Sequence, residues 1–356
     1  MSSPAVSLFG RSYRLSVQAQ TTSGQLENIV ISDSAWEPEA LRFTFDIEKV
    51  ALHTFWNATI RIYNCDGPIP SGPSEGQILS NLIIAEGATV TIEAGYLNGQ
   101  SGTIWQGEVF QPIWTRENVV DFVLTLKCIQ GRILGTNNFI NKTMPALQTA
   151  RGQAEFIAIN STIPVPYLPQ TMDAFDASTL TKTARPVTVF GDPSEHLFGI
   201  ADESGLMAWI GENGLSVSSL TDNLGPVVAS YAPAFSPGST PQTAPSGVSL
   251  TLIGTPQQTI LGADWTVLLD PRMNVTVPLS QAQVDLATIQ LAALPNPTPN
   301  GFMPPRPLAT NGIYVVVGVR HTGDTRGSEW LTHVTGITVV KDVIALLGDG
   351  RDPTSN

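Results

Sequence analysis

Four histidines are the first side chains to consider for metal binding or proton transfer. They are His53, His196, His321 and His333. No two of them form a His-x-x-x-His pair, and no Asp or Glu accompanies them at metal-ligand spacing. His321 and His333 lie on two neighbouring predicted strands and could face each other, although a structural position on a strand is the commoner role. The sequence therefore predicts no catalytic, cofactor-binding or metal-binding residue.

Other enzyme motifs are also missing from the sequence. It contains no G-x-G-x-x-G, G-x-x-x-x-G-K-[ST] or G-x-S-x-G pattern, and Asp33, Glu37 and Glu39 lack the alternation and glycine of a calcium loop. Paired carboxylates for sugar hydrolysis need only converge in space, so an all-β carbohydrate-active enzyme or sugar-binding module remains the alternative. Seven tryptophans could stack on sugars, although a core role is their default. They are Trp36, Trp56, Trp105, Trp114, Trp209, Trp265 and Trp330.

The composition is turn-rich, acidic and poor in charge. There are 18 Lys and Arg against 30 Asp and Glu, for a net charge of −12, and 13% of residues are charged, about half the usual fraction. No Lys/Arg cluster is present, which disfavours nucleic-acid binding and polybasic membrane attachment. No apolar stretch approaches the ~18 residues of a membrane anchor. Two cysteines, Cys65 and Cys128, are too few for a disulfide framework.

Most of the chain is predicted to form short antiparallel strands. In residues 41–48 apolar and polar side chains alternate, which places one face of a strand in a core. This pattern favours a barrel or a sandwich. Further strands are predicted at residues 58–64, 88–94, 104–110, 119–129, 206–210, 215–218, 248–254, 265–269, 313–320 and 330–340.

Two helices interrupt the strands. One is predicted around residues 143–157, with Thr143 as its cap and Pro145 in its first turn. The other begins at Asp192-Pro193-Ser194-Glu195 and can end at Gly205. Residues 280–283 could open a short helix or a polar loop, and the Pro- and Ser-rich residues 221–247 and 292–309 are predicted to be long loops.

Four segments, taken in combination, carry a family resemblance over about residues 40–340. They are N-A-T-I-R-I-Y-N at 57–64, G-T-I-W-Q-G-E-V at 102–109, L-I-G-T-P-Q-Q-T at 252–259 with V-L-L-D-P-R at 267–272, and V-R-H-T-G-D-T-R-G-S-E-W-L-T at 319–332. This pattern resembles the central baseplate hub protein of contractile-tailed bacteriophages, the tail protein D and myovirus hub family.

The resemblance implies a mainly β fold with a few helices, built from two similar β-barrels of the tail-hub type with inserted helical and loop-rich parts. Residues 1–113 would form the first barrel. Residues 114–135 and 310–345 would form the second, discontinuous one. Residues 136–309 would be the inserted region, and residues 346–356 a C-terminal tail.

The implied function is structural and not enzymatic, with no cofactor. The hub would be a homotrimer that joins the hexameric tail tube to the trimeric central spike and lets DNA pass, with baseplate wedge proteins and the tape-measure protein as further partners. It would reside in the virion tail after assembly in the host cytoplasm. The negative charge suits a DNA conduit, so we expect Asp46, Glu48 and Glu93 to line the bore.

Overall fold

The computed structural model of the chain describes residues 10–21, 25–32, 41–51, 55–64, 82–97, 99–118, 121–131, 138–178, 183–219, 225–231, 249–252, 262–285 and 311–338. The predicted loop at 292–309 and the predicted tail lie outside these residues, as do His53, Cys65, Trp36 and the three acidic residues Asp33, Glu37 and Glu39. No helix of the described part is long and apolar enough to cross a membrane.

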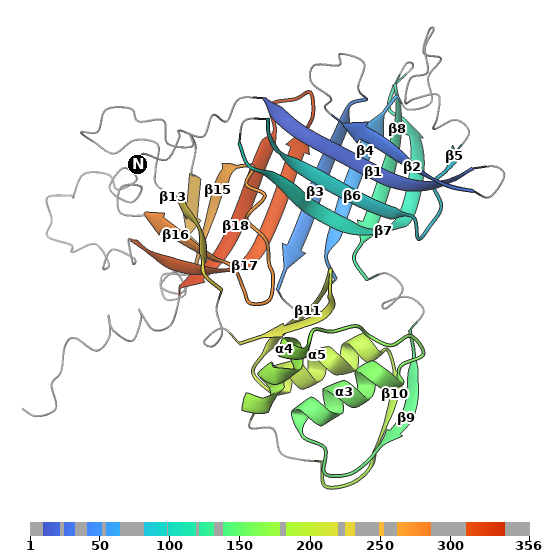
Figure 1. Ribbon diagram of the computed structural model, residues 1–356, viewed down its shortest axis with the longest axis vertical. Coiled ribbons are helices and arrows are strands. Elements are labelled where there is room, and N and C mark those ends of the chain that lie inside the picture. Colours follow the sequence, from blue (N-terminus) through green and yellow to red (C-terminus); the bar gives the residue numbers. More distant parts are fainter. Residues whose placement is uncertain are drawn as a thin grey trace, which may run out of the picture.

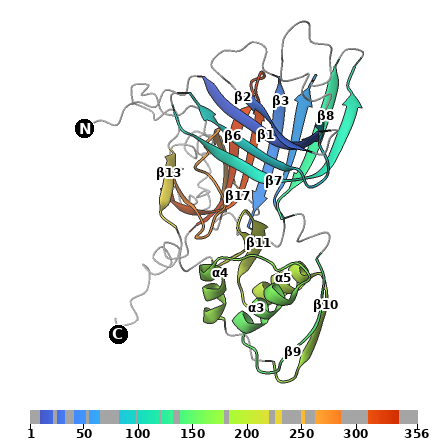
Figure 2. The same ribbon diagram turned by 45° about the vertical axis from the view of Figure 1, so that its right-hand side comes forward.

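One sheet of 14 strands is the largest element of the described structure, which confirms the mainly β class (Figures 1 and 2). Its strands are β1 (Arg11–Thr21), β2 (Leu26–Ser32), β3 (Phe43–Val50), β4 (Asn57–Tyr63), β5 (Leu82–Ile83), β6 (Thr89–Tyr96), β7 (Ser101–Arg116), β8 (Phe122–Ile129), β13 (Val227–Tyr231), β14 (Ser249–Leu252), β15 (Gly262–Leu268), β16 (Gln281–Asp285), β17 (Asn311–Asp324) and β18 (Trp330–Thr338).

The strand order joins the two ends of the chain. The main path runs β14-β15-β18-β17-β3-β4-β8-β7-β6-β1-β2, with β16 and β13 added beside β17 and β5 beside β1. Strand β17 pairs with β3 from Gly318↔Val50 to Asp324↔Thr44. Among the described strands, no pairing closes this path into a ring.

The predicted boundary at residue 113 falls inside β7, which runs to Arg116. Strand β8, expected in the second barrel, pairs with β4 on one side and β7 on the other. Hydrogen bonding therefore places residues 122–129 with the N-terminal strands.

The core lies between two layers of the curved sheet. Figure 1 shows β1, β6 and β7 crossing in front of β3 and β4, and the ring of Tyr13 on β1 meets that of Phe43 on β3 edge-on at 5.4 Å between centroids. Strand β3 alternates as predicted, with Phe43, Phe45 and Ile47 buried. Five tryptophans are buried as well: Trp56, Trp105, Trp209, Trp265 and Trp330.

Residues 138–219 form a separate cluster, here called the helical module, below the sheet in Figure 1. Two antiparallel strand pairs accompany its helices: β9 with β10, which are far apart in the sequence, and the hairpin of β11 with β12. Its elements are β9 (Ile140–Met144), α3 (Ala150–Asn160), α4 (Pro169–Asp173), the 3-10 helix η1 (Ala174–Ala177), β10 (Val187–Gly191), α5 (Pro193–Glu203), β11 (Met207–Gly211) and β12 (Gly214–Ser218).

The second predicted helix is confirmed as α5. Asp192 caps it by accepting a hydrogen bond from the Ser194 N–H at 2.8 Å, and Pro193 occupies the first turn. Gly205 follows the helix with φ of +69°, a conformation that suits glycine. The α5 start and end are therefore local properties of the sequence.

The first predicted helix starts later than expected. Thr143 belongs to β9, where it pairs with Thr188, and α3 begins at Ala150 with Thr149 as its cap. The Thr149 hydroxyl accepts from the Gly152 N–H at 3.2 Å. The prediction was wrong because the pairing of β9 with β10 uses residues that also fit a helix start.

Two further predictions need correction. Residues 281–285 are strand β16, not a helix or loop, because Ala282 and Val284 alternate into the core. Residues 227–231 of the predicted long loop form β13, which pairs in parallel with β16.

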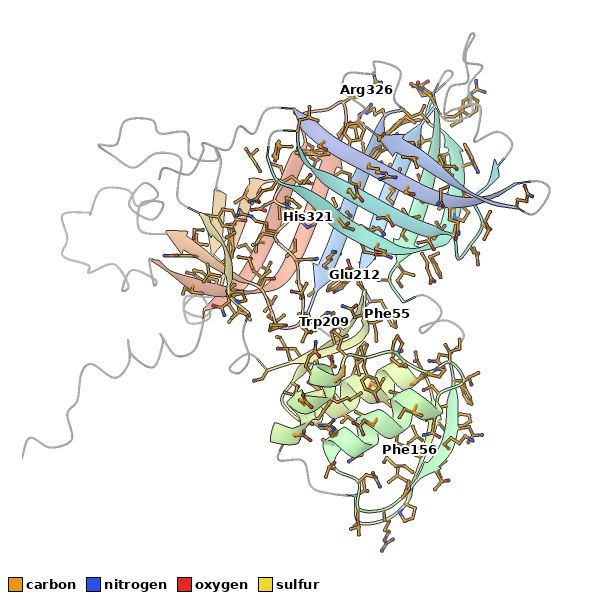
Figure 3. The ribbon with its side chains drawn as sticks, in the orientation of Figure 1. Phe55, Phe156, Trp209, Glu212, His321 and Arg326 are labelled. Atoms are coloured by element: carbon orange, nitrogen blue, oxygen red, sulfur yellow. The ribbon has the colours of Figure 1, made fainter. Side chains whose placement is uncertain are left out.

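The helical module contacts the sheet near Phe55, Trp209 and Glu212, which Figure 3 labels, and through a buried lysine. Phe55 forms a parallel bridge with Ile210, and Trp209 packs into the core of the sheet. Lys49 is fully buried. Its Nζ donates to Asn274 Oδ1 at 2.8 Å, lies 3.7 Å from Glu212 Oε1 and sits 5.0 Å from the centre of the Trp56 ring. Burial lowers the pKa of Lys49 to about 8, although Glu212 acts in the opposite direction.

A second buried polar side chain of this core is His321, which contacts the same 273–274 segment as Lys49. His321 Nδ1 lies 2.9 Å from Thr332 Oγ1, which accepts the Asp270 N–H, and His321 Nε2 lies 3.2 Å from the Met273 carbonyl oxygen. A carbonyl can only accept, so Nε2 donates and Nδ1 accepts the Thr332 hydroxyl proton. These partners select the neutral imidazole, and burial lowers the pKa of His321 to about 3.

We expect acid to destabilise the fold through His321. Between the ordinary pKa of 6.5 and about 3, the unfolded chain binds a proton that the folded chain excludes, so stability falls as pH falls. The loss reaches roughly 5 kcal/mol at most, at 1.36 kcal/mol per pKa unit. Urea unfolding at pH 7, 5 and 4 should show a weaker pH dependence for His321→Gln than for His333→Gln. Equal slopes in the two variants would contradict this account.

We also expect Lys49→Ala to lower the free energy of unfolding by about 2 to 4 kcal/mol, because it removes a packed stem and a buried ion-pair partner. Lys127→Ala, at an exposed lysine of β8, is the matched control and should stay within about 0.5 kcal/mol of the wild type. Denaturant titration measures both values. A loss for Lys49→Ala no larger than that of the control would show that the junction does not depend on this lysine.

Candidate functional site

The structure separates the histidines that the sequence placed on neighbouring strands. Arg320 pairs with His333 and His321 with Thr332, so the two imidazoles leave the sheet on opposite sides. His333 Nδ1 lies 2.8 Å from Thr266 Oγ1, whereas His321 is in the core. Within the described ranges, no three His, Cys, Asp or Glu side chains are grouped as metal ligands.

The side of the sheet opposite the core carries a continuous row of polar residues. In the alternating strand β3, Asp46 and Glu48 project away from the buried Phe45 and Ile47. The pairing register continues this side across neighbouring strands, with Glu48 opposite Arg320. We call it the polar face; it comprises Thr44, Asp46, Glu48, Asn57, Thr59, Arg61, Thr125, Lys127, Asp264, Thr266, Arg320, His333 and Thr335.

Charges of both signs share the polar face. The Arg320 guanidinium donates to both carboxylate oxygens of Asp46, at 2.7 and 2.6 Å. This hydrogen bonding raises the pKa of Arg320. Arg61, Lys127 and Arg320 thus accompany the acids Asp46 and Glu48 on the polar face. Glu93 lies on β6, paired with Arg14 of β1, and is not part of this face.

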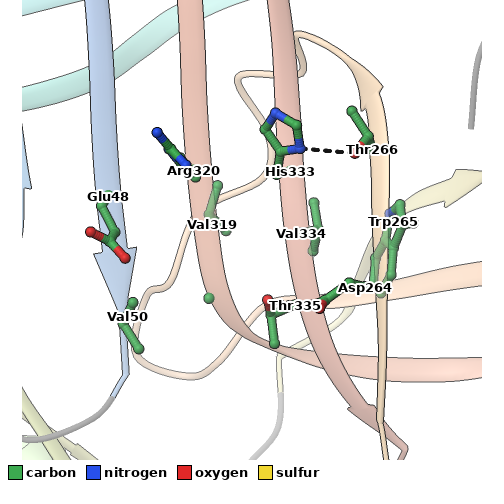
Figure 4. A pocket seen from close by; sticks show the side chains of 11 residues that line it. Glu48, Val50, Asp264, Trp265, Thr266, Val319, Arg320, His333, Val334 and Thr335 are labelled. Carbon is green, nitrogen blue, oxygen red and sulfur yellow. Dashed lines mark hydrogen bonds between the residues drawn. The ribbon is translucent and has the colours of Figure 1, made fainter. Parts of the chain in front are cut away.

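A concavity marks the middle of the polar face (Figure 4). Gly318 lines this concavity. A Cβ at Gly318 would lie 3.2 Å from the Cβ of Thr335. Figure 4 shows Glu48, Arg320 and His333 around it, and the Thr335 hydroxyl donates to Asp264 Oδ1 at 2.6 Å. The mixture of carboxylates, guanidinium, imidazole and hydroxyls is typical of a polar contact surface.

The motif near the C-terminus has a structural role that sequence reasoning missed. Asp324 accepts two hydrogen bonds from Arg42, at 3.1 and 2.6 Å, and one from the Arg326 N–H at 2.9 Å. Burial opposes the charge of Asp324, but these partners lower its pKa. Arg11 donates to the carbonyl oxygens of Asp324 and Gly327. The turn between β17 and β18 is thus clamped to the N-terminal strands, through residues that no local motif connects.

The tryptophans give the sugar-binding alternative no support. Five of the six that the structure describes are buried in hydrophobic clusters, as the default core role predicts. Trp114, on β7, is half exposed. One half-exposed ring among the described tryptophans is not by itself a sugar subsite.

Comparisons with known proteins show where this fold occurs. No protein-family model and no curated protein sequence matches the chain. A solved tail protein from Neisseria meningitidis is similar with a TM-score of 0.50 and 13% identity, over 92% of this chain and 97% of that one. The 43 kDa tail protein of prophage MuSo2 from Shewanella oneidensis is similar with a TM-score of 0.51 and 8% identity, over 91% and 98%. The resemblance read from the sequence is thereby confirmed at the level of architecture, and the chain has the fold of phage tail proteins.

Proposed function

We propose that the chain is the structural, non-enzymatic hub of a contractile-tail baseplate. It would form a homotrimer that joins the hexameric tail tube to the trimeric central spike and lets DNA pass. The observation that supports this proposal is the similarity of fold to two tail proteins, one of them from a prophage, over more than nine-tenths of both chains. The polar face of the sheet, with its mixed charges and hydroxyls, is consistent with a structural contact surface.

In this proposal the polar face lines the bore. Duplex DNA is held by proteins that neutralise its phosphates with clustered Lys and Arg. Here the Arg320 guanidinium already donates two hydrogen bonds to Asp46, and Glu48 lies opposite Arg320 on the neighbouring strand. Such a surface offers DNA hydration without a strong site of attachment.

The two-unit organisation is also part of the proposal. Strands β1–β8 would form the first unit and β13–β18 the second, meeting where β3 pairs with β17. In this proposal β8, which lies in the predicted second unit (114–135), belongs to the first unit, because β8 bonds to β4 and β7. Three chains with two such units each would present six similar positions to a hexameric tube.

The remaining partners follow from the same role. We propose contacts with the tail tube, the central spike, the baseplate wedge proteins and the tape-measure protein, in a virion tail assembled in the host cytoplasm. The helical module lies to one side of the sheet (Figure 2), so it adds a second surface at which one of these partners could bind.

The trimer is tested by the solution mass of the purified chain. Light scattering should give three times 38.0 kDa, because a ring that converts sixfold to threefold symmetry needs three copies. Mass should be measured from 1 to 100 µM, alone and with spike protein from the same virion. A monomer under all these conditions would contradict the hub proposal.

The bore assignment is tested by reversing charge on the polar face. The wild-type chain should leave duplex DNA unshifted in a gel at 150 mM salt, whereas the double variant Asp46→Lys, Glu48→Lys should retard it, because both changes add phosphate-binding charge. Glu195→Lys with Asp202→Lys, on exposed positions of α5, is the matched control and should retard DNA less. Retardation by the wild type, or equal retardation by both double variants, would contradict the assignment.

A further inference from the structure

A second cleft lies at the junction between the sheet and the helical module. The sheet contributes Thr89, Gln106, Glu108 and Gln130, and the helical module contributes Glu212 and Pro166 among others. Glu212, labelled in Figure 3, is on the turn between β11 and β12, close to the lower ends of the strands. Residues of both the sheet and the helical module therefore line the cleft.

Gln130 is buried in this cleft with an unused acceptor. It is 3% exposed; its backbone N–H donates to the Trp56 carbonyl oxygen at 2.9 Å, and its Nε2 donates to the Gln106 carbonyl oxygen at 2.6 Å. Its Oε1 is buried and accepts no hydrogen bond from the residues that the structure describes. Buried amide oxygens are normally satisfied, so the unused acceptor points to a bound donor.

The chemistry of the lining favours a cationic donor. Two carboxylates, Glu108 and Glu212, line the cleft, and none of the described residues that line it is Lys, Arg or His. One oxygen of Glu212 lies 3.7 Å from Nζ of Lys49, which donates to Asn274. Pro164 and Pro166 have no N–H and therefore add no backbone donors.

We propose that the junction cleft binds a guanidinium group, presented by an arginine of a partner chain. A guanidinium has five N–H donors in a plane, so it can satisfy Gln130 Oε1 and a carboxylate at the same time. An ammonium offers three donors around one point and matches spread acceptors less well. Two carboxylates plus amide oxygens are fewer charged ligands than a calcium loop supplies. The site goes beyond the proposed hub role and does not depend on the trimer.

The test uses the full chain and the tripeptides Gly-Arg-Gly, Gly-citrulline-Gly and Gly-Lys-Gly. Isothermal titration calorimetry at low salt should show binding of the arginine peptide, at least tenfold weaker binding of the lysine peptide, and none of the uncharged citrulline peptide. Gln130→Met and Glu108→Gln should each weaken arginine binding at least tenfold. Glu48→Gln, on the polar face, is the matched control and should leave it unchanged.

Several outcomes would overturn the inference. They are no binding of the arginine peptide at 20 mM, equal affinity for the arginine and lysine peptides, or unchanged affinity in the Gln130→Met variant. Circular dichroism and light scattering of each variant establish that it is folded and report its mass separately. A chain that fails to trimerise but binds the arginine peptide would contradict the hub proposal and leave this inference intact. A chain that trimerises but does not bind the peptide would contradict this inference and leave the hub proposal intact.

Discussion

The pairing of β17 with β3 is the contact on which the rest of the structure depends. It joins residues from opposite ends of the chain in seven consecutive register pairs, from Gly318↔Val50 to Asp324↔Thr44. Because side chains alternate along each strand, this one register decides both sides of the sheet. It places Glu48 beside Arg320 on the polar face and Ile47 beside His321 in the core. A slip of one residue would exchange those surfaces.

Two buried polar groups, Lys49 and His321, contribute to that core, and both contact the segment at residues 273–274. Lys49 reaches Asn274 and the helical module, and His321 reaches Thr332 and the backbone of Met273. Buried polar groups stabilise a fold only when their partners are present. Lys49 and His321 therefore favour one arrangement of β3, β17 and the 273–274 segment over others. Apolar packing alone is less selective, since it tolerates several arrangements of similar volume.

Local features of the fold could be predicted from the sequence, and distant ones could not. The cap of α5, the turn after it and the alternation of β3 depend on neighbouring residues, and all three are confirmed. The start of α3 and strand β16 were misjudged because partners far along the chain decide them. The same holds for the surface: alternation predicts that Asp46 and Glu48 leave the core, but only the β17 register shows that Arg320 neutralises one of them. The Arg42–Asp324 clamp joins residues 282 positions apart, a distance that no spacing rule covers.

The pairing of β3 with β17 also has a consequence for synthesis on the ribosome. Strand β3 is translated long before its partner β17, because β4 to β16 lie between them in the chain. Until β17 has been made, the β3 edge stays open beside an apolar surface, and such edges invite pairing with other chains. A product that is truncated before β17 would leave that edge unpaired. We expect this topology to make such truncated chains prone to aggregation.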